Sequence, residues 1–126
     1  TALKIKELTR MITEPYSSAD FRHGPLAVLE GGFPLIIVAP SGKVFEDLAE
    51  FAGEAKRRGA ELIVISDDAD LLKQAQLPLA LPSGVPEWLS PLVAVLPGQL
   101  FAMHLAMAKG LEVDQPIGLT KITETR

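Results

Sequence analysis

The chain has 126 residues, no cysteine, and 12 basic against 16 acidic side chains, which gives a formal net charge of −4. This length allows one domain, and 48% hydrophobic with 22% charged residues is typical of a globular protein with its own core. The lack of cysteine excludes disulfides, iron–sulfur clusters, thiolate zinc sites and a cysteine nucleophile, and the acidic balance argues against nucleic-acid binding.

The first third of the chain predicts short elements. Apolar residues at Leu3, Ile5 and Leu8 indicate that the chain begins inside an element, and no secretory signal is visible. A short strand is expected around Ile12–Tyr16. A short helix is expected over Leu26–Glu30, because the preceding Gly-Pro places a proline near its first turn.

Two continuous apolar runs, Phe33–Ala39 and Glu61–Ser66, predict strands that are covered on both faces, as in parallel sheets. Between them, apolar residues recur at helical spacing, with Ser41 as a possible cap and Gly59 as a possible end. Glu54 lies four residues before an arginine and can form an ion pair with it on the helix surface. This strand–helix–strand order is a βαβ unit.

The remaining elements are weaker or unusual. A short helix is expected over 69–76, and Leu77–Leu81 predicts a third strand, placed near an edge because Pro78 cannot donate to the ladder. Pro86–Lys109 predicts one long apolar helix, interrupted or kinked by two prolines.

The long helix has the length of a membrane span, since Trp88–Ala108 contains no charged residue and about 20 apolar residues suffice to cross a bilayer. It stands alone and contains prolines and polar residues. We therefore expect a helix buried on most sides in a soluble core, and no membrane. His104 lies within it and is expected to be a satisfied core histidine.

Together these elements predict an α/β domain with a small, mostly parallel sheet and helices on both sides. Ligands of such sheets bind beyond the carboxyl ends of the strands, here Pro40–Gly42 and Ser66–Asp68. Dinucleotide, phosphate-loop and nucleophile-elbow motifs are absent. The two histidines lack metal-ligand spacing, so neither a metal nor a cofactor is predicted.

Two polar passages do not fit a plain core. Residues 14–25 place Arg22 and His23 beside a rigid Gly-Pro turn, where an imidazole could transfer a proton near neutral pH. The alternative is that both residues simply cover the start of a helix. In the tail, Lys121 could bind a phosphate or carboxylate or form an imine, or it could be a solvated C-terminal lysine.

Four segments carry a resemblance across nearly the whole chain: Ala2–Glu7, Glu14–Pro25 ending in Arg-His-Gly-Pro, Lys109–Pro116 and Gly118–Lys121. On these segments the chain resembles the sugar isomerase (SIS) family, most closely the last SIS domain of the glucosamine-6-phosphate synthases. The resemblance implies a three-layer αβα domain of the flavodoxin-like Rossmann type. It also implies that SIS domains are used in pairs, in dimers, with a phosphorylated sugar as ligand.

The resemblance also implies roles for individual residues. Glu7 matches the base that moves a proton between C1 and C2 of a hexose phosphate. His23 matches the histidine that helps to open the sugar ring, contributed to the neighbouring subunit's site, and Lys121 matches the lysine that forms an imine with the open-chain ketose. Lys4 matches a lysine near the same site. We expect the substrate to be bound by Lys4, Arg22 and Thr120.

The chain departs from the family pattern in ways that leave alternatives open. It lacks a phosphate-binding S-x-S-G-x-T loop and a glutaminase domain. We therefore expect residues 1–126 to be one SIS domain, the C-terminal part of a longer cytoplasmic double-SIS protein, and inactive alone. The expected activity is isomerisation, amination or deamination of fructose 6-phosphate or glucosamine 6-phosphate. A non-catalytic sugar-phosphate-binding or dimerisation module is the alternative. A third idea is a nucleotide-binding receiver-like domain, which needs an isolated aspartate at a strand end, and Asp67 and Asp68 are the candidates.

Overall fold

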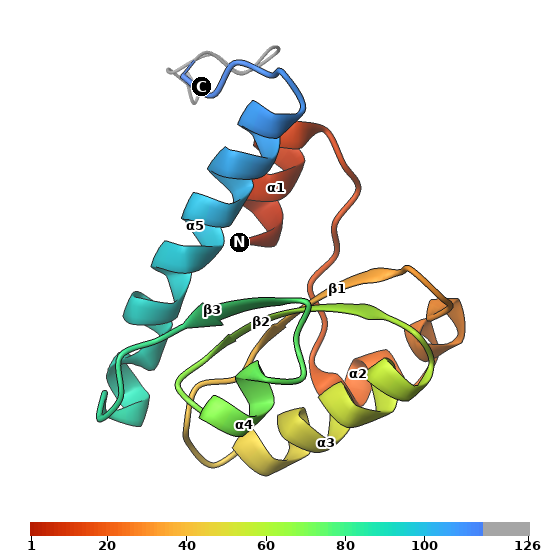
Figure 1. Ribbon diagram of the computed structural model, residues 1–126, viewed down its shortest axis with the longest axis vertical. Helices are drawn as coiled ribbons and strands as arrows, with labels where there is room; N and C mark the ends of the chain where they lie inside the picture. Colours follow the sequence, from red (N-terminus) through yellow and green to blue (C-terminus); the bar gives the residue numbers. More distant parts are fainter. Residues whose placement is uncertain (115–126) are drawn as a thin grey trace, which may run out of the picture. The chain divides into compact units, whose positions relative to one another are not determined.

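The computed structural model describes residues 1–114, which divide into two compact units. The larger unit spans Tyr16–Pro97, and the smaller one combines Thr1–Pro15 with the chain from Gly98 onward. The larger unit carries the sheet (Figure 1).

The sheet contains three parallel strands in the order β1-β2-β3. They are β1 (Pro34–Val38), β2 (Glu61–Ser66) and β3 (Leu77–Ala80). All three were predicted, and β3 lies at the edge, where the missing N–H of Pro78 costs little. The register pairs Val38 with Ile65, and Ile65 in turn with Leu79.

The core of the larger unit lies between the sheet and the helices that follow its strands. The alternate residues Leu62 and Val64 of β2 are fully buried, and so are Ala52 and Ala55 of α3 (Phe45–Arg57). In Figure 1 the helices α2, α3 and α4 gather on the same side of the sheet. The apolar faces that the sequence predicted for strand and helix therefore meet as expected.

Helix α3 begins later than its predicted cap. Its first residue follows Val44, with no side-chain cap, so the assignment of Ser41 as N-cap is wrong. The backbone N–H of Ser41 instead donates to the carboxylate of Asp67 at 2.7 Å, which holds residue 41 at the strand end and delays the helix. The predicted end is confirmed, with Gly59 at φ 88°, a conformation that favours glycine. The predicted ion pair of Glu54 with Arg58 is present at 3.6 Å.

The shorter elements differ more from the predictions. No strand forms at residues 11–17, so that prediction is wrong. Ile12 is 91% exposed, and within residues 1–114 no strand pairs with this segment. The chain enters α2 (Ser18–Arg22) and then a 3₁₀ helix, η1 (Pro25–Val28), where a helix was expected. Helix α4 (Ala69–Leu72) is half the predicted length, because the chain turns back toward β3.

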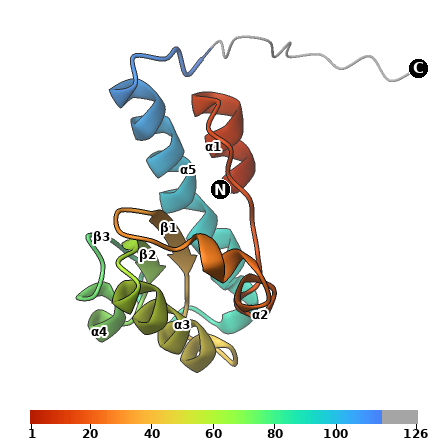
Figure 2. The ribbon, with the colours of Figure 1, turned by 90° about the vertical axis from the view of Figure 1, so that its right-hand side faces the viewer.

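The smaller unit packs α1 (Ala2–Thr9) beside the second half of α5 (Ser90–Ala108), as both ribbon views show (Figure 2). Its buried residues are Ile5, Thr9, Ala102 and Ala106. Close approach depends on Gly98, because a Cβ at that position would lie 2.0 Å from the Thr1 hydroxyl. The small residues Gly98, Ala102 and Ala106 of α5 therefore allow α1 to pack closely against it.

Helix α5 is preceded by a 3₁₀ turn, η2 (Glu87–Leu89), and is continuous through Pro97. Burial on most sides was expected and is wrong for residues 1–114. Leu92, Leu96, Leu100 and Met107 are between 55% and 68% exposed. His104 is also exposed, so it is not a core histidine. The stretch Glu87–Ala108 is long and apolar enough to cross a membrane by length and composition, yet one such helix is weak evidence for a span.

Candidate functional site

The predicted ring-opening histidine, His23, closes α2. Its backbone N–H donates to the carbonyl of Asp20 at 3.2 Å, and its side chain is exposed. Pro25 then begins η1 two residues later, so rigid backbone lies on both sides of the imidazole. The position of this side chain therefore follows the position of α2.

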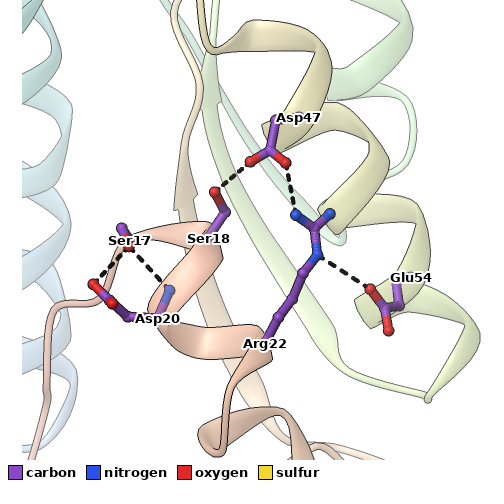
Figure 3. A network of polar contacts seen from close by, with 6 residues as sticks. All are labelled: Ser17, Ser18, Asp20, Arg22, Asp47 and Glu54. Atoms are coloured by element: carbon purple, nitrogen blue, oxygen red, sulfur yellow. Dashed lines mark hydrogen bonds and ion pairs between the residues drawn. The ribbon is translucent and has the colours of Figure 1, made fainter.

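Arg22, the neighbour of His23, lies against α3 (Figure 3). Its Nη1 donates to Oδ1 of Asp47 at 2.6 Å, and its Nε lies 3.5 Å from Oε2 of Glu54. The guanidinium also stands 5.5 Å from the centre of the Phe51 ring, within cation–π range. These contacts engage Arg22 in the anchoring of α2. Its prediction as a substrate contact remains a prediction.

The other end of α2 is held by hydroxyl groups. Ser17 caps the helix by accepting from the N–H of Asp20 at 3.1 Å, and its hydroxyl donates to the Asp20 carboxylate at 2.7 Å. The hydroxyl of Ser18 donates to Oδ2 of Asp47. Both oxygens of Asp47 are thereby used, one at each end of α2 (Figure 3).

These contacts stabilise the charged forms of both groups. The hydroxyl of Ser18 and the guanidinium of Arg22 lower the pKa of Asp47 below its ordinary 3.8. The hydrogen bond to Asp47 likewise raises the pKa of Arg22. A carboxyl group with a lowered pKa stabilises the fold at neutral pH, and this contribution is lost as the pH falls through the lowered value, below 3.8.

We therefore expect the variant Asp47→Asn to be less stable than the parent protein at neutral pH, with a difference that shrinks as the pH falls below 3.8. The measurement is urea unfolding of both proteins across that pH range. If the difference in free energy of unfolding between the two proteins stays the same below pH 3.8, the charge of Asp47 does not stabilise the fold.

Two further predicted residues lie together on α1. The Nζ of Lys4 is 2.9 Å from Oε2 of Glu7, an ion pair of residues three apart. The Glu7 side chain is 26% exposed and that of Lys4 is 50% exposed. A surface pair of this kind contributes little to stability, but it fixes a half-buried carboxylate beside a cation.

The carboxyl ends of the strands, where a ligand was expected, form a small pocket. Its lining residues are Pro40, Ser41, Asp67, Leu81, Pro82, Val85, Ser90 and Val93. Two carboxylates cover the backbone donors there: Asp67 accepts from the Ser41 N–H at 2.7 Å, and Glu87 accepts from the Lys43 N–H at 2.8 Å. A phosphate at this strand end would meet negative charge, so the expectation of an anionic ligand at this edge gains no support.

The environment of Asp67 explains how its charge is maintained. Partial burial alone would raise the pKa of Asp67, but hydrogen bonds from the N–H and hydroxyl of Ser41 outweigh it and lower the pKa. Asp68 accepts from the N–H of Leu71 at 2.7 Å and so caps α4. Both aspartates that suggested a receiver-like site thus have local structural roles.

The predicted site residues therefore fall into three groups. Lys4 and Glu7 meet on α1 in the smaller unit, and Arg22 and His23 end α2 in the larger one. Thr120 and Lys121 lie outside the described residues. Among residues 1–114, no group of three or more His, Asp or Glu side chains could hold a metal ion.

Sequence reasoning missed the residues of α3 that hold α2. Asp47, Phe51 and Glu54 are spaced four and three residues apart and so share one face of the helix. That spacing is visible in the sequence. The partners Ser18 and Arg22 are 29 and 25 residues away, and no local pattern indicates the pairing.

The model of the SIS domain family matches residues 1–109, and the chain belongs to this family. The predicted α/β class is confirmed by the parallel sheet and by the similar fold of solved phosphosugar enzymes. The chain is therefore an SIS domain and not the receiver-like domain that was the third alternative.

Among curated proteins, the chain is 43% identical over 120 residues to the glutamine–fructose-6-phosphate aminotransferase (isomerizing) of Thermococcus kodakarensis, and 42% identical to that of Pyrococcus horikoshii. Each match covers 95% of this chain and 20% of the relative, so the chain spans about a fifth of their length.

Among solved structures, the chain resembles the C-terminal domain of the glucosamine-fructose-6-phosphate aminotransferase of Francisella tularensis. The TM-score is 0.77 and the identity 30%, and the match covers 90% of this chain and 32% of that one. It also resembles a glucosamine-6-phosphate deaminase from Thermotoga maritima, with a TM-score of 0.71, 25% identity, and coverage of 95% and 34%.

Proposed function

We propose that residues 1–126 form the C-terminal SIS domain of a double-SIS enzyme that acts on a hexose 6-phosphate. The reaction is aldose–ketose isomerisation, or amination or deamination, of fructose 6-phosphate or glucosamine 6-phosphate. The observation that carries the proposal is 43% identity over 95% of the chain to an isomerising aminotransferase. The fold of the deaminase from Thermotoga maritima supports the same substrate class.

In this proposal Glu7 is the base. A carboxylate that is fixed within hydrogen-bond reach of C1 and C2 can remove a proton from one carbon and return it to the other. The half-buried position of Glu7 and its ion pair with Lys4 support this role, because both restrict the carboxylate to few orientations. Lys4 also provides a positive charge near the oxygen atoms of the substrate.

His23 and Lys121 act before and during this proton transfer. Ring opening requires a proton to move from the anomeric hydroxyl to the ring oxygen O5, which an imidazole can assist near neutral pH. The exposure of the His23 side chain supports a role toward a site completed by another subunit. Lys121 then attacks the C2 carbonyl of the open-chain ketose, and loss of the carbonyl oxygen as water gives an imine. Its amine must be neutral part of the time for this attack. Thr120 and Arg22 contact the substrate beside these two residues.

The phosphate is bound outside the strand-end pocket of this domain. Asp67 and Glu87 occupy the backbone donors that a phosphate would use there. The chain also lacks the S-x-S-G-x-T loop. Both observations support a second SIS domain as the source of the phosphate-binding groups.

A non-catalytic module is the alternative, and it is supported by the absence of that loop. Isothermal titration with glucosamine 6-phosphate, together with proton exchange at C2 of the sugar, separates the two functions. Binding with exchange by the complete protein supports the enzyme. Tight binding without exchange would establish the module, and absence of binding would exclude both.

We propose that the protein is a cytoplasmic homodimer in which the apolar face of α5 contacts another SIS domain. Trp88, just before the helix, is 79% exposed, and the exposed side chains of Leu92, Leu96 and Leu100 follow at intervals of four residues. A continuous apolar face of this kind is typical of an interface. We expect light scattering to give at least a dimer at micromolar concentration, and a monodisperse monomer would contradict the assembly.

A further inference from the structure

We propose that Asp47 is a positioning residue for His23, acting through Ser18 and Arg22. The role of His23 in the reaction rests on the proposed function. The dependence of its position on Asp47 rests on the contacts alone, and the two can be tested separately.

The argument begins with the size of α2. It contains five residues, and a helix of this length is not stable alone, because its nucleation costs more than its few hydrogen bonds return. Something outside the helix must hold it. The aromatic contacts supply part of this: Phe21 is 7% exposed and packs edge-on against Phe51 with ring centres 5.4 Å apart.

The apolar packing of Phe21 holds α2 on the core without directional bonds, and the hydrogen bonds of Asp47 add a defined orientation. One carboxylate oxygen accepts from Ser18 at the first residue of the helix, and the other accepts from Arg22 at the last. Two attachments at opposite ends fix both the position and the rotation of the helix. Glu54 adds a third contact, 3.5 Å from Arg22 Nε.

The contacts of Asp47 with both ends of α2 determine the position of His23. It directly follows Arg22, and among residues 1–114 its ring has no hydrogen bond or ion pair with another residue. Its backbone is fixed through the carbonyl of Asp20 within the same helix. A rotation of α2 on α3 would therefore carry the imidazole with it.

The first experiment measures the position of His23 directly. The ring and backbone resonances of His23 and Gly24 are recorded by NMR in the parent protein and in Asp47→Ala and Asp47→Asn. We expect large shifts for Asp47→Ala and smaller ones for Asp47→Asn, because the amide retains a hydrogen-bond acceptor for Ser18 or Arg22. His104 is the internal reference and should not shift.

Asp70→Asn is the matched control, since Asp70 of α4 also forms a short ion pair, 2.7 Å from Lys73. It removes the same charge from the same unit and should leave His23 unchanged. Unshifted His23 resonances in Asp47→Ala, or equal shifts in Asp70→Asn, would overturn the proposal.

The second experiment asks whether positioning matters for turnover. Asp47→Ala should lower kcat for cyclic fructose 6-phosphate about tenfold, because loss of alignment costs rate even when every reacting group is present. Binding of sorbitol 6-phosphate, an open-chain analogue that needs no ring opening, should weaken much less than kcat falls, because Arg22 keeps its contact with Glu54. An equal fall in binding and in kcat would indicate general damage to the fold and overturn the positioning role.

The third experiment compares kcat of the single and double variants of Arg22 and Asp47. If Arg22 and Asp47 act as one unit, Arg22→Ala combined with Asp47→Ala should lower kcat no further than either change alone. Additive losses would contradict the proposal. If His23→Ala leaves kcat unchanged while the NMR shifts occur as expected, the proposed role of His23 fails and its positioning by Asp47 stands.

Discussion

We expect Phe51→Ala to lower the free energy of unfolding by about 3–5 kcal/mol, the range for truncation of a buried aromatic residue. Phe51 is 5% exposed and belongs to the core cluster beneath the sheet. It also contacts the ring of Phe21 and the guanidinium of Arg22. Its loss therefore leaves a cavity and also removes the aromatic contact of α3 with α2, the helix that precedes His23.

Urea unfolding monitored by circular dichroism measures this effect. Val44→Ala is the control, because Val44 is 61% exposed just before the same helix and its truncation should change stability by no more than about 0.5 kcal/mol. Equal effects of the two changes would mean that α3 is not packed against the sheet as described.

The largest expected effect on activity is that of Glu7→Gln. We expect proton exchange at C2 of the sugar to fall by at least about a hundredfold, because general base catalysis contributes roughly 10²–10⁴ in rate. Glutamine has nearly the same shape as glutamate and can still accept a hydrogen bond from Lys4. In the parent protein the Lys4 Nζ lies 2.9 Å from the Glu7 carboxylate. The fold of α1 should therefore be retained, and the loss should fall on kcat.

Exchange is measured by NMR in deuterium oxide with the complete protein. Glu46→Gln is the matched control, since it removes an exposed carboxylate from the first turn of α3 and should leave the rate unchanged.

Lys121→Ala should also abolish imine-dependent turnover. Unaltered exchange in both Glu7→Gln and Lys121→Ala would remove these residues from the reaction.

The strands were the most predictable part of the fold. Glu61–Ser66 was predicted to the residue, because a continuous apolar run rich in branched side chains has few alternatives to a buried parallel strand. The edge position of β3 followed from one proline. Ile12–Tyr16 failed because a short apolar alternation becomes a strand only where a neighbour offers hydrogen bonds, and none does so here within residues 1–114.

The burial of α5 could not be predicted from its composition. A helix that is apolar on all sides indicates that some surface will cover it, but not whether that surface belongs to the same chain. The exposure of Leu96 and His104 shows the consequence within the described residues. Composition predicted the helix correctly and its surroundings wrongly.

The candidate site was predictable in its residue types and not in its connections. Lys4 and Glu7 are three residues apart, so helical geometry alone predicts their contact, and it is present. The contact of Arg22 with Asp47 joins residues 25 positions apart and depends on how α2 lies on α3. Such tertiary contacts leave no local signature, although they determine where His23 stands.

The central claim is that an acid from the first helix, an imidazole after α2 and an amine from the tail act on one sugar phosphate. The most direct test is a crystal structure of the complete protein with bound fructose 6-phosphate. We expect Glu7, His23 and Lys121, drawn from one subunit or from two, each within hydrogen-bond or covalent reach of the same sugar. A well-ordered sugar phosphate bound away from all three side chains in every subunit would contradict the account.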